Sequence, residues 1–130
     1  MQDITLTVHP QGDGTLVRAT MGGYLTEKDI PKLVAWGEEA NRVIAATYAR
    51  TKKPVQVAVD TTALEGYKDP SVLSVLTEIL VKDAPFIRKT ATFGGSFKIA
   101  LAQDVLKAFA NRDNIRNFQT EKEALEWLAG

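Results

Sequence analysis

In VAVDTTALEGYKDPSVLSVL, residues 57–76, a strand pattern leads through an acidic loop into the start of a helix. VQVAV, residues 55–59, is a nearly continuous β-branched run, which is typical of a parallel strand covered on both faces. Asp69-Pro70-Ser71 follows, where Asp can accept hydrogen bonds from free N–H groups and Pro suits the first helical position. The stretch therefore predicts a central strand, an exposed loop and a well-capped helix.

Strand and helix patterns alternate through the rest of the chain. ITLTV at 4–8 and TLVRATM at 15–21 flank a QGDG turn and predict a β-hairpin. Short strands are also expected at TATF, 90–93, and at IRNF, 115–118. Apolar residues at helical spacing predict helices between 26 and 48, between 70 and 85, from 96 to 109 and from 121 to 129.

The expected helices have expected caps and apolar faces. Thr26 or Asp29 starts the first helix, Ser96 caps the third, and Thr120 with Glu123 forms a capping box for the last. The face expected for the first helix comprises Ile30, Leu33, Val34, Gly37, Ile44 and Tyr48. The face expected for the second comprises Val72, Val75, Leu76, Ile79 and Leu80. The face expected for the third comprises Phe97, Leu101, Val105, Ala108 and Phe109.

This order of elements predicts an α/β fold. A hairpin followed by strands that alternate with helices gives one mixed, mostly parallel sheet of four to five strands, flanked by about four helices. At 130 residues the chain fits a single domain, residues 1–130. A domain of this size buries roughly two-thirds of the surface that its unfolded chain exposes, so it can hold a substantial core.

Composition narrows the classes of function. Sixteen basic and sixteen acidic residues cancel, so the basic excess of a nucleic-acid-binding protein is missing and no nucleic-acid partner is expected. The chain has no cysteine, which removes disulfides, thiolate nucleophiles and Cys-ligated zinc. No leader pattern and no apolar run long enough to span a membrane is visible, so a cytoplasmic protein without an integral membrane segment is expected.

The sequence offers little for catalysis. His9, at the end of the first strand, is the single histidine, and a lone strand-end histidine is usually a surface residue. Neither a Ser-His-Asp nor a Cys-His grouping can be built, and no metal-ligand spacing is present. We therefore expect a protein that is not an enzyme and that needs no metal and no cofactor.

Two helix starts could receive an anion or a phosphate. Gly94-Gly95-Ser96 joins a strand to a helix, where free N–H groups and the helix dipole favour an anion, although a flexible turn with a cap explains the same residues. Ser71 lies in the first turn of the second helix, where a phosphate would meet the favourable end of the dipole. A plain first-turn serine is the alternative.

Several motifs resemble the SpoIIAA-like members of the STAS/SEC14 group, over nearly the whole chain from about residue 17. They are Gly23-Tyr24-Leu25-Thr26 with Asp29, VQVAVD with Gly66-Tyr67, RKTATFGGS at 88–96, IRNF at 115–118 and TEKEALEWL at 120–128. The resemblance implies a sheet of four or five strands with flanking helices. It also implies one of two functions, and the fold alone does not decide between them.

One implied function is that of an anti-sigma-factor antagonist, a partner-binding module switched by phosphorylation at the start of the helix after the central strand. Where such STAS domains read Asp-Ser-Ser-Gly, this chain reads Asp69-Pro70-Ser71-Val72, so Pro70 replaces the usual phosphoacceptor. The hydroxyls that remain nearby are those of Ser71, Thr61 and Thr62. The candidate phosphorylation or partner site is therefore Asp60, Thr61, Thr62, Asp69 and Ser71.

The other implied function is that of a SEC14-like carrier or sensor of a lipid or other small apolar ligand. The candidate ligand wall is Tyr67, Leu73, Leu76, Leu80 and Phe86. A ligand site would need an apolar cavity of roughly 300 Å³ or more, and ordinary core packing is the alternative.

The leading hypothesis is a non-enzymatic STAS-like module that binds an anti-sigma-like or kinase-like protein through the 60–71 loop and the second helix. The alternative is the apolar-ligand carrier. A homodimer is also expected, because small α/β modules can pair through exposed sheet edges or helices.

Overall fold

Six strands form one mixed sheet in the computed structural model, which describes residues 4–67 and 69–130, without the side chains of Phe97, Leu101, Gln103 and Phe109. The strands are β1 (Thr5–Pro10), β2 (Leu16–Leu25), β3 (Val55–Asp60), β4 (Leu64–Tyr67), β5 (Ile87–Phe93) and β6 (Ile115–Phe118). The helices are α1 (Ile30–Thr51), α2 (Pro70–Asp83), α3 (Phe97–Phe109) and α4 (Glu121–Ala129). Short 3-10 turns, Glu27–Asp29 and Ala84–Phe86, precede α1 and follow α2.

The sheet has the order β1-β2-β3-β5-β6, and β4 pairs with the far end of β2. The β1–β2 pair is antiparallel and every other pair is parallel, so the predicted mixed, mostly parallel sheet is confirmed. Six strands replace the four to five expected, because the 60–71 segment contains β4. Leu64, Gly66 and Tyr67 are buried there, so the expectation of an exposed loop was wrong for this part of the chain.

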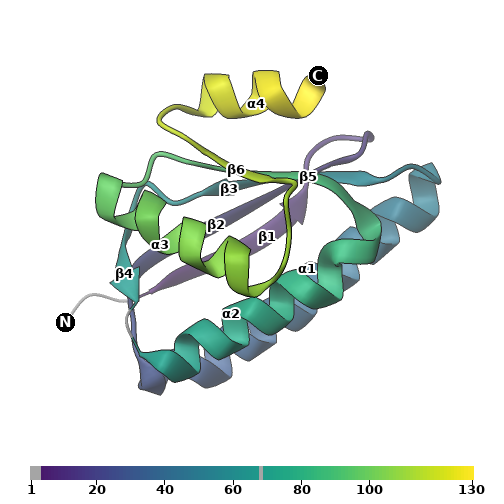
Figure 1. The fold of residues 1–130 in the computed structure, drawn as a ribbon. Helices are drawn as coiled ribbons and strands as arrows, with labels where there is room; N and C mark the ends of the chain where they lie inside the picture. The colour runs from purple at the N-terminus through teal and green to yellow at the C-terminus, as the bar shows by residue number, and fades with distance from the viewer. Residues whose placement is uncertain (1–3, 68) are drawn as a thin grey trace.

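Helices cover the two faces of the sheet unequally. Figure 1 shows α1, α2 and α3 on one face and α4 alone on the other. The central strand β3 contributes side chains to the cores on both faces: Val57 and Val59 belong to the larger core, and Ala58 belongs to the smaller one under α4. Period-two alternation in a strand buried on both faces produces the continuous apolar run that the sequence displays.

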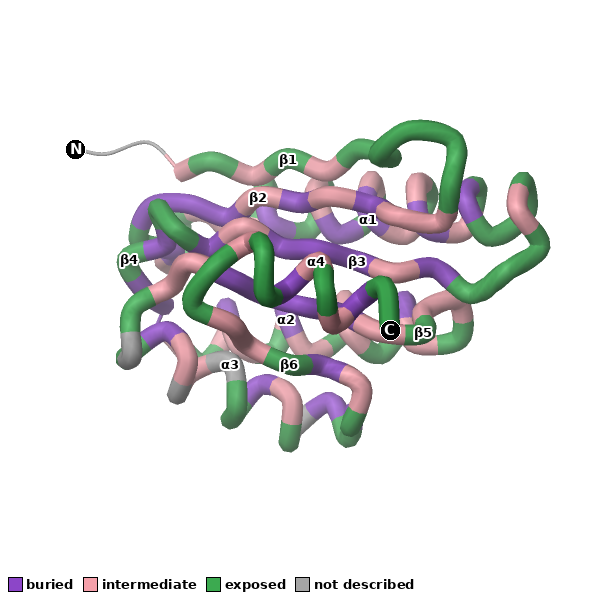
Figure 2. Tube along the Cα trace, turned by 90° about the horizontal axis from the view of Figure 1, so that it is seen from above, coloured by how far each residue is buried: buried purple, intermediate pink, exposed green. Residues whose placement is uncertain are grey.

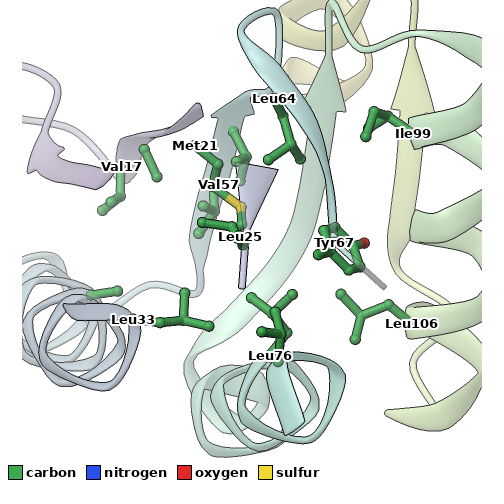
Figure 3. Close-up of a cluster of buried hydrophobic side chains, with 14 of the residues drawn as sticks. Val17, Met21, Leu25, Leu33, Val57, Leu64, Tyr67, Leu76, Ile99 and Leu106 are labelled. Atoms are coloured by element: carbon green, nitrogen blue, oxygen red, sulfur yellow. The ribbon is translucent and has the colours of Figure 1, made fainter. Parts of the chain in front are cut away.

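The larger core lies between the sheet and three helices. Figure 3 shows Leu33 of α1, Leu76 of α2 and Leu106 of α3 directed toward strand side chains such as Met21 and Val57. The smaller core is closed by α4, whose Leu128 is buried and whose Trp127 packs against Phe118, with 5.5 Å between ring centroids.

Most of the expected caps are confirmed. Asp69 Oδ1 accepts from Ser71 N at the start of α2, Ser96 Oγ accepts from Ile99 N in α3, and Thr120 Oγ1 accepts from Glu123 N in α4. Both candidates at the first helix have a role. Thr26 caps the 3-10 turn and Asp29 is the N-cap residue of α1.

Two expected helix faces need correction. Among the described side chains of α3, Ile99 and Leu106 are buried, as is Ala110 directly after the helix, whereas Val105 is 48% exposed and Ala108 is exposed as well. The other three residues predicted for that face, Phe97, Leu101 and Phe109, have side chains outside the described part. In α1, Val34 and Tyr48 are exposed, and the buried side is Leu33, Gly37, Ala40, Ile44 and Thr47.

Among the residues that the structure describes, none of the helices is long and apolar enough to cross a membrane.

Candidate functional site

The carboxyl ends of β3 and β5 bring two of the predicted segments together, because Asp60–Thr62 lies against Gly94–Gly95. Thr61 is fully buried, and its hydroxyl donates to the Phe93 carbonyl oxygen over 2.9 Å. The Asp60 carboxylate accepts from the Thr62 N–H over 2.9 Å. Burial removes the Thr61 hydroxyl from any kinase that acts on the folded chain, while Thr62 is exposed.

The glycine turn after β5 is required by close packing. Gly94 has φ +82°, a conformation that favours glycine, and a Cβ there would lie 2.1 Å from Thr62 Oγ1. A Cβ on Gly95 would lie 2.8 Å from Thr61 Oγ1. The Gly94 N–H donates to the Phe118 carbonyl oxygen over 3.2 Å. These contacts account for both glycines, and the anion site at Gly94, Gly95 and Ser96 stays a prediction.

A double-mutant cycle tests this packing. Gly94→Ala is expected to lower the free energy of unfolding by about 2 kcal/mol, since it adds both positive-φ strain and the contact with Thr62. Thr62→Ala removes the hydroxyl from the contact, so the two losses, measured by urea unfolding, should sum to more than the loss in the double variant. Additive losses would contradict close packing between these residues.

The remaining pair of the predicted phosphorylation site, Asp69 and Ser71, lies at the start of α2. Asp69 Oδ1 accepts from the Ser71 hydroxyl at 2.5 Å and from the Ser71 N–H at 2.9 Å. These two hydrogen bonds hold the pKa of the Asp69 carboxyl below its usual value, and the bond from the Ser71 hydroxyl has the larger effect. Pro70 occupies the first helical position between them. Ser71 is half-buried, and its hydroxyl belongs to a tight Asp-Ser pair.

Tyr24 lies near the end of β2 beside β4, the strand that precedes α2, and was missed as a site residue by the sequence reasoning. Tyr24 pairs with Gly66 between β2 and β4, one position before the Leu25–Tyr67 pair. Gly66 has φ +151°, and a Cβ on it would lie 3.3 Å from Tyr24 Cε2, so glycine leaves room for the ring. The Tyr24 side chain is 41% exposed, although it belongs to a strand whose neighbouring residues are buried. An exposed aromatic residue on a rigid strand is a good anchor for a protein partner.

Arg18 links Asp60, at the end of β3, to the helix α4. Its guanidinium donates to both carboxylate oxygens of Glu121 in α4, at 2.9 and 3.0 Å, and lies 3.8 Å from Asp60 Oδ2. It also lies over the Phe93 ring, 5.4 Å from the centroid. The hydrogen bond with Glu121 is the main cause that raises the pKa of Arg18. Asp60 is thus part of a polar contact that docks α4, a role that local sequence patterns do not reveal.

The predicted apolar wall does not enclose a ligand-sized chamber. Leu76 and Leu80 line an internal cavity of about 60 Å³ between the sheet, α2 and α3, well below the roughly 300 Å³ of a small-molecule pocket. Phe86 packs edge-on against Tyr48, with 5.7 Å between centroids, and Leu73 is partly buried. Tyr67 is buried in the core, and this burial raises the pKa of Tyr67 to about 12.

A second polar group lies inside the protein, at the end of α2. Asp83 is 4% exposed and accepts from Asn41 Nδ2 over 2.9 Å. Arg112 is 7% exposed and donates to Thr90 Oγ1, to Asn114 Oδ1 and to the Leu80 carbonyl oxygen. Burial raises the pKa of Asp83, while Asn41 and the charges of Arg112 and Lys82 act in the opposite direction. Both charged side chains are thus largely removed from solvent.

His9 lies apart from these residues. It is exposed on the edge strand β1, in register with Arg18 of β2. Within residues 4–67 and 69–130, no group of three or more His, Asp or Glu side chains is placed to hold a metal ion.

Solved structures share this fold, whereas no family model and no curated protein matches the sequence. An uncharacterized protein of the DUF3478 family with a SpoIIAA-like fold, from Shewanella loihica PV-4, is similar with TM-score 0.64 and 20% identity, over 98% of each chain. The anti-sigma factor antagonist SpoIIAA in its unphosphorylated form gives 0.62 at 13% identity, over 97% of each chain. An anti-sigma factor antagonist from Mycobacterium paratuberculosis gives 0.54 at 16% identity, over 98% of this chain and 96% of that one. The fold is therefore SpoIIAA-like, as the sequence motifs indicated.

Proposed function

We propose that this protein is a non-enzymatic regulatory module that binds a protein partner through the start of α2 and the adjoining end of β2. The binding area, here called the α2-start surface, consists of Tyr24, Asp69 and Ser71. The proposal rests chiefly on the accessible Asp69–Ser71 pair at the first turn of α2, in a fold shared with two anti-sigma factor antagonists. By the resemblance, this turn is where STAS domains carry their regulatory serine.

Pro70 changes how such a surface would be switched. A phosphate on Ser71 would meet the favourable end of the α2 dipole, but it would stand beside the Asp69 carboxylate that now accepts from the same hydroxyl at 2.5 Å. Because an aspartate carboxyl is ionised at neutral pH, the two negative charges would repel. A modification at Ser71 would therefore open the Asp69 cap and alter the shape of the α2-start surface.

The alternative function, a carrier of a lipid or another apolar ligand, has weaker support. The predicted wall residues all pack in one core, and the cavity beside Leu76 and Leu80 holds about 60 Å³. A ligand of lipid size would require α2 or α3 to move away from the sheet.

Affinity capture with quantitative mass spectrometry tests the partner-binding function. A partner recovered by the wild type should be recovered at least about tenfold less by Tyr24→Ala, the loss expected for an aromatic anchor. Ser71→Asp should also reduce recovery, because it adds the repelling charge, whereas Ser71→Ala should have a smaller effect. Lys122→Gln, on the exposed side of α4, is the matched control and should leave recovery unchanged.

Two results would contradict the proposal. One is capture of no protein by any form of the chain. The other is a partner recovered equally by the wild type, Tyr24→Ala and Ser71→Asp. If Tyr24→Ala reduces recovery and Ser71→Asp does not, the surface stands and the switch at Ser71 fails.

A further inference from the structure

One edge of the sheet is formed by β1, with α1 beside it. Figure 2 shows β1 as the outermost strand, with exposed and half-buried residues alternating along it. Between this strand and α1 runs an open groove of about 540 Å³, lined by Leu6 and Val8 on one side and by Lys32, Ala35, Trp36 and Glu39 on the other. Leu6 and Val8 are only partly buried within one chain. The groove is thus an apolar floor flanked by charges.

Trp36 holds α1 against the edge strand. Its indole Nε1 donates to the Thr7 carbonyl oxygen in the middle of β1 over 2.9 Å. The face of α1 beside β1 is therefore fixed relative to the sheet, and a surface that is already ordered loses less entropy when a protein docks on it.

The charges on that face of α1 are arranged symmetrically. Lys32, Ala35, Trp36 and Glu39 follow the i, i+3, i+4, i+7 spacing of one helical stripe, with opposite charges at its two ends. The ends are about 10 Å apart along the helix at 1.5 Å per residue. A two-fold axis between Ala35 and Trp36 would place each Lys32 opposite the Glu39 of a second copy. The stripe is therefore complementary to itself.

We propose that this face, the stripe Lys32, Ala35, Trp36 and Glu39 with the groove beside it, binds a second copy of the chain in an antiparallel α1–α1 dimer. Ala35 is exposed and small, so two helices can approach closely at the axis, and the half-buried Trp36 supplies an aromatic anchor on each side. Within one chain Glu39 pairs with Arg42, but the Arg42 side chain is 70% exposed. A pair this exposed contributes little and leaves Glu39 available. The formal net charge of zero adds no overall repulsion between copies.

This inference is independent of the proposed function, because the stripe and the α2-start surface share no residue. Sedimentation velocity over a dilution series of the full chain tests it. The wild type should dimerise, and Lys32→Glu or Glu39→Lys should each raise the dimer dissociation constant at least about tenfold, because each places like charges at both contacts. The matched control Lys122→Glu, on α4, should not change it.

Charge exchange separates loss of docking from loss of folding. The double variant Lys32→Glu/Glu39→Lys should regain dimerisation, and an equimolar mixture of the two single variants should form heterodimers although neither dimerises alone. Thermal unfolding of each variant provides the folding control. A wild type that stays monomeric throughout would overturn the proposal and leave the groove to a different partner. Single variants that dimerise like the wild type, or a mixture that fails to associate, would overturn it as well.

Discussion

Replacement of Leu76 with Ala is expected to lower the free energy of unfolding by about 3–5 kcal/mol. Leu76 is 4% exposed and points from α2 into the main core, where it lines the internal cavity of about 60 Å³ (Figure 3). Truncation would enlarge a void that already exists, so the loss should lie in the upper part of the range for Leu→Ala. Urea unfolding measures it. Val81→Ala on the same helix is the control, since Val81 is 53% exposed and should change stability by only about 0.5 kcal/mol.

Experiments on Leu76 and on the cavity beside it also distinguish a packed core from a ligand-binding chamber. If the cavity is a packing void, native mass spectrometry of the wild type purified from cells should give the mass of the chain alone. If Leu76→Ala costs less than about 1 kcal/mol, Leu76 is not a core residue. That result, or an apolar molecule that co-purifies with the wild type, would contradict this description and favour the carrier function.

Replacement of Arg112 with Ala is expected to lower the free energy of unfolding by about 3–5 kcal/mol, because it removes one charge from a buried polar group. Three hydrogen bonds from the guanidinium would be lost, including the bond to Thr90 Oγ1 inside the core. Asp83 would also lose the positive charge that partly offsets its burial. Arg116→Ala is the control, because Arg116 is exposed and lies over the Phe118 ring.

This loss should depend on pH in a defined direction. Burial raises the pKa of Asp83 in the folded chain above its ordinary value of 3.8, so its contribution to stability declines as pH rises from below 3.8 through the raised value. Removal of the Arg112 charge raises the pKa of Asp83 further. The difference between wild type and Arg112→Ala should therefore widen as pH rises above 3.8. A constant difference between acidic and neutral pH would show that Asp83 and Arg112 are not coupled.

Local patterns predicted most elements correctly and failed where tertiary contacts decide. β4 was missed because LEGY is short and contains Gly66, whose φ of +151° does not suit a regular strand. The buried face of α3 was placed on Val105 and Ala108 because apolar residues occur around much of that helix, so spacing alone does not fix which side meets the sheet. The contacts of Ile99 and Leu106 with the main core determine it.

The candidate site was predictable only in part, for a related reason. The Asp69 cap is local and was read from three adjacent residues. The bond between Arg18 and Glu121 joins residues 103 positions apart, and the Tyr24 ring lies against Gly66, which belongs to a strand that was not expected. Asp83 and Arg112 were unexpected in the interior, because charged residues at helix ends and in loops are usually solvated.

Site-specific photo-crosslinking tests most directly whether the α2-start surface binds a protein. With p-benzoylphenylalanine in place of Tyr24, light should produce a covalent adduct with a partner in cells, and Ser71→Asp in the same chain should weaken it. The same amino acid in place of Lys122, on the opposite layer, should give only background. Equal adducts at both positions, or none at position 24, would contradict a partner-binding role for this surface.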